Sequence, residues 1–188
     1  MSVLEEGNIQ IHTENIFPII KKAVYSDHEI FLRELVSNSV DAIKKRRLAS
    51  MAGDVNEGGE GEVNITIDRE QSTLTISDNG IGMNAEEIKK YINQVAFSSA
   101  EEFLEKYKKN DEGFIGHFGL GFYSCFMVAK KVELITKSAI PESKSYKWSC
   151  DGSPKFTINI TERENPGTDV ILYLMEEEIE YIEPARIK

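Results

Sequence analysis

Six short segments in which apolar and polar residues alternate constrain the fold of this chain most strongly. Such alternation is typical of β-strands with one buried face. The first two segments are separated by a short polar turn, and the other four follow one another later in the chain, so the segments do not alternate with helices. A mostly antiparallel sheet is therefore expected. The segments are 63–68, 73–77, 132–137, 144–150, 156–161 and 168–174.

The remaining apolar periodicity predicts helices. From about residue 29 to residue 52 apolar side chains recur at helical spacing, and Gly53 follows as a stop signal. Residues 85–95 show the same spacing after Asn84, which is suited to cap a helix. A short apolar helix is expected over 122–129. The expected fold class is α+β: a two-layer sandwich of a mostly antiparallel, mixed β-sheet with helices on one face.

Composition excludes several classes of partner. The 188 residues carry 22 Lys and Arg against 32 Asp and Glu, and the net charge of −10 at pH 7 opposes the phosphate backbone of nucleic acid. No apolar run approaches the roughly 18 residues that span a bilayer, and no apolar signal core is present. We expect a single cytoplasmic domain over 1–188, without nucleic acid or membrane partners, in which Cys125 and Cys150 are reduced and buried.

A polar stripe runs along the long helix. Glu34, Asn38 and Asp41 stand at positions i, i+4 and i+7, on one face of a helix that otherwise faces the core. A solvated helix face is one interpretation. The other is a carboxylate and an amide that project into a cleft, where a carboxylate can deprotonate a water and an amide oxygen suits Mg²⁺.

A turn rich in Asp, Asn and Gly follows the second strand, over 78–83. These residue types favour an ordinary turn. Gly80, Gly82 and Ala85 also match a dinucleotide-binding fingerprint between a strand and a helix. That hypothesis is rejected because it needs a second parallel strand, and residues 98–113 are polar and charged where that strand should stand.

Three glycines, Gly116, Gly119 and Gly121, precede the short helix that begins near Phe122. Glycine permits close approach of the backbone, and a helix N-terminus offers free N–H groups, so the combination suits a phosphate. A loop without a ligand remains the alternative. Similarly, Thr168 at the start of the last strand is either an ordinary strand residue or a hydroxyl at the edge of a ligand.

Taken in order, these motifs resemble the ATP-binding domain of the GHKL superfamily. Residues 31–42 and 115–124 are similar to the bacterial-type ninety-kilodalton heat-shock chaperones within it. The resemblance covers nearly the whole chain and implies the Bergerat fold, with ATP or ADP and Mg²⁺ as ligands. It is carried by Glu34-x-x-x-Asn38-x-x-Asp41-Ala42, Asp78-x-Gly80-x-Gly82-Met83, Gly116-x-x-Gly119-x-Gly121-Phe122 and Gly167-Thr168.

The resemblance also implies a role for each residue on the adenine side. Asp78 would accept a hydrogen bond from the adenine amino group, and Thr168 would assist through a water. Gly82 and Met83 would shape the adenine pocket, and Asp41 would belong to the same nucleotide-binding set.

On the phosphate side, the resemblance implies that Asn38 helps to hold Mg²⁺ and that Glu34 is the general base for the attacking water. Phe122 and the three glycines would meet the phosphates through backbone N–H groups. Residues 98–121 would form a lid that closes over ATP.

For the parent protein, the resemblance implies a longer chain with middle and C-terminal domains, a homodimer, client proteins and adenine-pocket inhibitors of the ansamycin type. Slow hydrolysis is expected of this domain alone, because the middle segment of the family supplies a catalytic arginine. Two other functions remain open: the kinase core of a sensor histidine kinase, and a nucleotide-regulated binding module without useful chemistry. Tyr91, Phe97 and Ser99 depart from residues that the family commonly carries.

Overall fold

The computed structural model describes residues 29–93, 121–153 and 155–183. Six strands form one sheet in the order β1-β2-β6-β3-β4-β5, and every pairing between them is antiparallel. The expected α+β class is thereby confirmed, and no parallel pair of the kind that a dinucleotide-binding fold needs occurs in this sheet. The strands are β1 (Val63–Asp68), β2 (Thr73–Asp78), β3 (Ala129–Lys137), β4 (Ser145–Cys150), β5 (Phe156–Thr161) and β6 (Gly167–Leu174).

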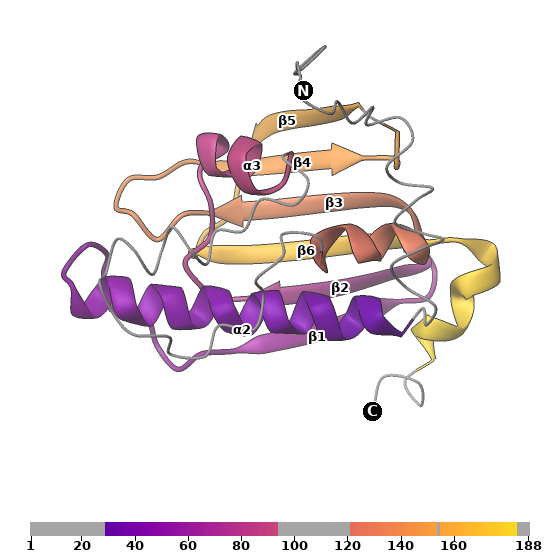
Figure 1. The fold of residues 1–188 in the computed structure, drawn as a ribbon, viewed down its shortest axis with the longest axis horizontal. Coiled ribbons are helices and arrows are strands. Elements are labelled where there is room, and N and C mark those ends of the chain that lie inside the picture. Colours follow the sequence, from indigo (N-terminus) through magenta and orange to yellow (C-terminus); the bar gives the residue numbers. More distant parts are fainter. Residues whose placement is uncertain (1–28, 94–120, 154, 184–188) are drawn as a thin grey trace, which may run out of the picture.

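The helices gather on one face of the sheet, as Figure 1 shows. Helix α2 (Ile30–Met51) is 22 residues long and packs against the 3₁₀ helix η3 (Gly121–Met127) and against β2. Helix α3 (Ala85–Tyr91) follows β2, and a second 3₁₀ helix, η4 (Glu176–Ile182), follows β6. The predicted two-layer arrangement is therefore confirmed within the described residues. None of their helices is long and apolar enough to cross a membrane.

Local sequence signals account for the helix ends. The Asn84 side chain accepts the backbone N–H of Glu87, and the Glu87 carboxylate accepts the N–H of Asn84, so the expected cap is part of a complete capping box. Gly53, beyond the end of α2, has φ of +83°, which a residue without a side chain adopts at little cost.

Two helices differ in length or type from the sequence prediction. The helix expected over 85–95 ends at Tyr91, and just beyond it the Asn93 side chain accepts a hydrogen bond from Trp148 Nε1. The apolar segment expected as a helix over 122–129 is the 3₁₀ helix η3, and β3 already begins at Ala129. Short 3₁₀ turns often serve as such connectors.

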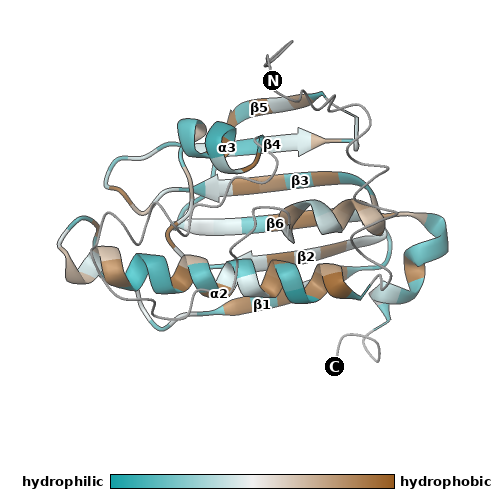
Figure 2. Cartoon of the chain, in the orientation of Figure 1, coloured by the Kyte–Doolittle hydropathy of each residue, from teal (hydrophilic) through white to brown (hydrophobic). Residues whose placement is uncertain are grey.

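The core lies between the helices and the sheet. Leu134, Leu172 and Trp148 from the central strands are almost completely buried, together with Phe31 of α2. Figure 2 shows the matching alternation of hydrophobic and hydrophilic residues along α2. Cys125 and Cys150 are both buried and unbridged, as the sequence predicts.

Candidate functional site

The polar stripe of α2 is not an ordinary solvated helix face. Asp41 is only 5% exposed, and Glu34 and Asn38 are half-buried. Ser39, which lies between them in the sequence, is also buried, and its hydroxyl donates to the Asp78 carboxylate. Helix α2 therefore directs the Ser39 hydroxyl toward the carboxylate at the end of β2.

Backbone contacts hold α2 against the turn after β2. The N–H of Ile81 donates to the carbonyl of Ala42 at 3.0 Å, and Arg46 Nη1 donates to the carbonyl of Asn79 at 2.7 Å. A Cβ on Gly80 would lie 2.6 Å from atoms of Ala42, so only glycine permits this close approach.

Asp78 is buried as well, with 7% of its surface exposed. Burial raises its pKa to about 6, while hydrogen bonds from Gly80 N–H and Ser39 and the nearby Arg163 guanidinium oppose that rise. Burial of an ionised carboxylate destabilises the folded protein. A carboxyl group at this buried strand end is therefore a candidate functional group.

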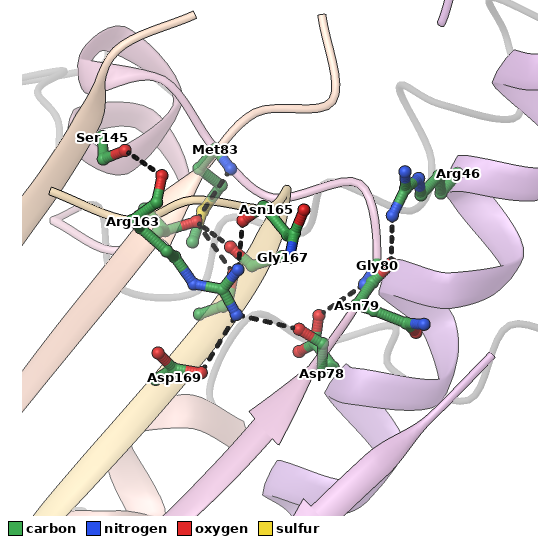
Figure 3. A network of polar contacts seen from close by, with 12 residues as sticks. Arg46, Asp78, Asn79, Gly80, Met83, Ser145, Arg163, Asn165, Gly167 and Asp169 are labelled. Carbon is green, nitrogen blue, oxygen red and sulfur yellow. Dashed lines mark hydrogen bonds and ion pairs between the residues drawn. The ribbon is translucent and has the colours of Figure 1, made fainter. Parts of the chain in front are cut away.

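Arg163, in the turn between β5 and β6, contacts the same strand end (Figure 3). Its Nη2 donates to the carbonyl of Asp78 at 3.3 Å and pairs with Asp169 at 3.0 Å. The Ser145 hydroxyl donates to the carbonyl of Arg163 at 3.1 Å and thereby anchors the turn. Arg46 and Arg163 therefore donate hydrogen bonds to two successive carbonyl groups, those of Asn79 and Asp78, from opposite sides (Figure 3).

Strand pairing places Thr168 directly opposite Asp78. Thr168 is 7% exposed, and its neighbour Gly167 has φ of +133°. A Cβ on Gly167 would lie 2.1 Å from the carbonyl oxygen of Asp78, so glycine is required for this strand to approach.

The turn that carries Gly82 and Met83 packs against the end of β3. Gly82 has φ of +61°, and a Cβ there would lie 1.9 Å from the carbonyl oxygen of Lys137. Met83 is half-buried, and its backbone N–H donates to Thr136 Oγ1 at 3.0 Å. Asp78, Thr168, Gly82 and Met83 therefore lie at one end of the sheet. Asp41 lies on α2 next to Ala42, whose carbonyl accepts the N–H of Ile81 in the same turn.

Only some of the residues expected to contact the phosphates lie in the part of the chain that the structure describes. A Cβ on Gly121 would lie 2.6 Å from Glu34 Oε2, so the structure brings that glycine and the expected base together. The ring of Phe122 packs in the core, 5.6 Å between centroids from Trp148. Gly116, Gly119 and residues 98–120 of the expected lid lie outside the described residues.

Lys45 belongs to this region, although sequence reasoning did not select it. Burial lowers its pKa to about 8, against the electrostatic effects of Asp41 and Glu87. In the sequence, Lys45 stands four residues after Asp41 in the predicted long helix, a spacing that places the two side chains on the same helix face and could have identified Lys45. The half-buried Lys45 therefore places a positive charge near Asp41 on the same helix.

The donor chemistry fits Mg²⁺ held together with a substrate. The described residues contain no group of three or more His, Cys, Asp or Glu side chains that could hold a metal ion by themselves. The half-buried Asn38 on α2 would supply an amide oxygen, a ligand type that Mg²⁺ accepts when it binds few protein groups alongside phosphates.

Comparison with known proteins agrees with the geometry. Residues 25–181 match the family of histidine kinase-, DNA gyrase B- and HSP90-like ATPases. The chain is 56% identical over 184 residues to "Chaperone protein HtpG" of Bacteroides thetaiotaomicron, and 49% identical over 185 residues to that of Porphyromonas gingivalis. Each alignment covers 98% of this chain, but the chain spans only 27% of the length of either relative.

Proposed function

This chain belongs to the family of histidine kinase-, DNA gyrase B- and HSP90-like ATPases, and from that premise we propose that it is the ATP-binding domain of a chaperone. The observation that carries the proposal is the buried Asp78 carboxylate, placed opposite Thr168 and below Ser39. An ionised carboxylate is a pure hydrogen-bond acceptor, and the adenine amino group is the matching donor.

We assign the adenine side to Asp78, Thr168, Gly82, Met83 and Asp41. Asp78 accepts a hydrogen bond from the amino group of the base. The glycine contacts that hold the turn after β2 keep this carboxylate in place before ligand arrives, which lowers the entropic cost of binding.

On the phosphate side, Asn38 would hold Mg²⁺ through its amide oxygen, and that ion would neutralise charge on the phosphates. Glu34 is the general base that accepts a proton from the attacking water. Gly121 and Phe122, with Gly116 and Gly119, present backbone N–H groups to the phosphates. A lid formed by residues 98–121 completes the site in this proposal.

The parent protein would place this domain before middle and C-terminal domains, act on client proteins as a homodimer in the cytoplasm, and accept ansamycin-like inhibitors in the adenine pocket. These proposals rest on relatives about four times as long as this chain. Hydrolysis by this domain alone should be slow.

Calorimetry with ADP and ATP in the presence of Mg²⁺ tests nucleotide binding. Replacement of Asp78 by Asn should weaken binding about 100-fold or more, because an amide presents a donor where an acceptor is needed. Asp151→Asn is the control, since Asp151 is exposed at the end of β4. Equal affinity of the Asp78→Asn variant and the parent chain would refute the adenine assignment.

A separate measurement distinguishes an ATPase from a binding module without chemistry. Glu34→Ala should retain ATP binding and lose hydrolysis, because only the base for the attacking water is removed. Hydrolysis at the parental rate in this variant would rule out Glu34 as the base.

A further inference from the structure

The guanidinium of Arg163, in the turn between β5 and β6, is fixed beside the end of β2. Its Nη2 donates to the backbone carbonyl of Asp78 at 3.3 Å and to Asp169 Oδ1 at 3.0 Å, and its Nη1 donates to the carbonyl of Asn165. Figure 3 shows the guanidinium between Asp78 and Asp169. Sequence reasoning did not select Arg163.

These contacts determine where a permanent positive charge lies. A guanidinium stays protonated in proteins. Only 15% of the Arg163 side chain is exposed, so water and salt screen its charge less than they screen a surface charge. The Ser145 hydroxyl, which donates to the Arg163 carbonyl at 3.1 Å, anchors the backbone as well. Arg163 therefore places a localised positive charge next to Asp78.

Groups from several elements act on the carboxyl group of Asp78. Burial raises its pKa to about 6, and a backbone N–H of the following turn and the Ser39 hydroxyl of α2 oppose that rise. Of the charged groups, Arg163 lowers this pKa and Asp169 of β6 raises it. Arg46, also on α2, donates to the next carbonyl along the chain. The Asp78 carboxyl group thus titrates near neutral pH, where the loss of one favourable charge changes how much of it is ionised.

The proposed binding of the adenine amino group needs the ionised form of Asp78. A carboxylate accepts hydrogen bonds at both oxygens, whereas a protonated carboxyl group carries an O–H donor and accepts more weakly. When only a fraction of the free protein is competent to bind, the affinity for a ligand is reduced by that fraction. The affinity for ADP should therefore follow the ionised fraction of Asp78.

We propose that Arg163 is a positioning residue of the nucleotide site: its guanidinium, held at the Asp78 carbonyl and at Asp169, keeps the Asp78 carboxyl group ionised at neutral pH. This inference rests on the proposed ATP-binding function and deepens it. Arg163 acts through Asp78 and does not need to touch the nucleotide. Removal of its charge should shift the loss of ADP affinity in acid to higher pH.

The pH dependence of ADP affinity tests the proposal. Calorimetry with Mg²⁺ on the parent chain and on Arg163→Met gives the ratio of their affinities at each pH, from which the titration of the ADP phosphates cancels. At pH 8 the two proteins should bind ADP about equally. At pH 5 only about a tenth of parental Asp78 is ionised, and the variant should bind ADP about three- to tenfold more weakly than the parent.

Two further variants separate the charge of Arg163 from its structural contacts. Arg163→Lys keeps the charge and should keep the parental pH dependence to within about twofold. Asp169→Asn removes the charge that opposes Arg163, so at pH 5 this variant should bind ADP about two- to threefold more tightly than the parent. Arg69→Met, which removes a cation from an exposed pair, is the control and should match the parent at both pH values.

A purely structural role for Arg163 predicts a different result, namely the same loss of ADP affinity at pH 5 and pH 8. That result, or an unchanged affinity at both, would overturn the inference while leaving the proposed function intact. So would weaker binding by Asp169→Asn at pH 5. If Arg163→Met does not fold, Arg163→Gln removes the charge and retains hydrogen-bond donors. A parent chain that binds no ADP at pH 8 would contradict the proposed function itself.

Discussion

At the scale of single residues, the candidate site contains the ionisable carboxyl group of Asp78 at a buried position where an uncharged side chain would make the folded protein more stable. Asp78 is buried among neighbours from β2, α2 and the turn that carries Arg163, and this burial raises its pKa to about 6 because the ionised form is destabilised. Active and binding sites often contain groups that lower the stability of the folded protein. A need for the Asp78 carboxylate as a hydrogen-bond acceptor for a ligand explains why such a group is present here.

Replacement of Asp78 by Asn should therefore stabilise the ligand-free protein at neutral and higher pH. The raised pKa means that folded Asp78 holds its proton more tightly than unfolded Asp78, so wild-type stability falls as pH rises from about 4 through about 6. A shift of about two units corresponds to roughly 3 kcal/mol, an upper value for the gain at pH 8.

Thermal unfolding of the parent chain and Asp78→Asn at pH 8 and pH 5 checks this. The melting temperature of the variant relative to the parent should be higher at pH 8 than at pH 5. The same difference at both pH values would show that Asp78 is not an ionised, buried group.

At the scale of secondary-structure elements, Arg163 connects the β5–β6 turn to the ends of β2 and β6. It is largely buried, with 15% of its side chain exposed, and its Nε has no hydrogen-bond partner. Arg163→Met should lower the free energy of unfolding by about 1–3 kcal/mol, because the Asp78 carbonyl and the Asp169 carboxylate lose a donor.

Arg69→Met provides the comparison for Arg163. Arg69 pairs with Glu183 at 3.0 Å, but both side chains are more than half exposed. Such surface pairs contribute at most about 1 kcal/mol. Urea denaturation of the two variants should rank Arg163→Met as clearly the less stable, and the reverse order would contradict a connecting role for Arg163.

The other face of the sheet contains a further buried carboxylate, which is fully paired. Glu133 of β3 is 5% exposed; Lys131 and Lys147 contact it at 2.8 and 2.9 Å, and the Tyr173 hydroxyl donates to it at 3.1 Å. Burial acts to raise its pKa, but these three hydrogen bonds together hold the pKa below its ordinary value.

Glu133→Gln should destabilise the sheet by about 1–2 kcal/mol at pH 7, since charge-assisted hydrogen bonds to two lysines are lost. Because the pKa is lowered in the folded state, this contribution is present above the usual glutamate range and is lost as pH falls through the folded value. Denaturation at pH 7 and pH 4, with exposed Glu162→Gln as the control, should show a cost for Glu133→Gln that shrinks at pH 4. A constant cost would be the contradicting result.

At the scale of the whole molecule, ligand binding and folding are coupled. A nucleotide that binds only the folded chain should stabilise it by about 2.7 kcal/mol at a ligand concentration 100 times the dissociation constant. Differential scanning calorimetry with ADP and Mg²⁺ should show this as a rise in melting temperature that grows with ADP concentration. The rise should vanish in Asp78→Asn, and an equal rise in that variant would place the nucleotide elsewhere.

Much of the fold and of the candidate site was predictable because the relevant signals are local. Alternation along each strand predicts the hairpins, Asn84 as a cap predicts the start of α3, and the turn after β2 draws attention to Asp78. The resemblance added the expected roles of Glu34 and Asn38. Helix lengths were less predictable, since the end of α3 at Tyr91 and the 3₁₀ geometry of η3 depend on packing against other elements.

The sequence by itself determined the fold class and singled out the polar residues to which we assign the chemistry, because periodicity and turn-forming residues act over a few neighbouring positions. Only the tertiary structure decided that β6 lies between β2 and β3. That order brings Thr168 between Asp78 and Thr136, which are far apart in the sequence. It thereby sets the burial of Asp78, since that burial depends on non-local strand pairing that no short segment encodes.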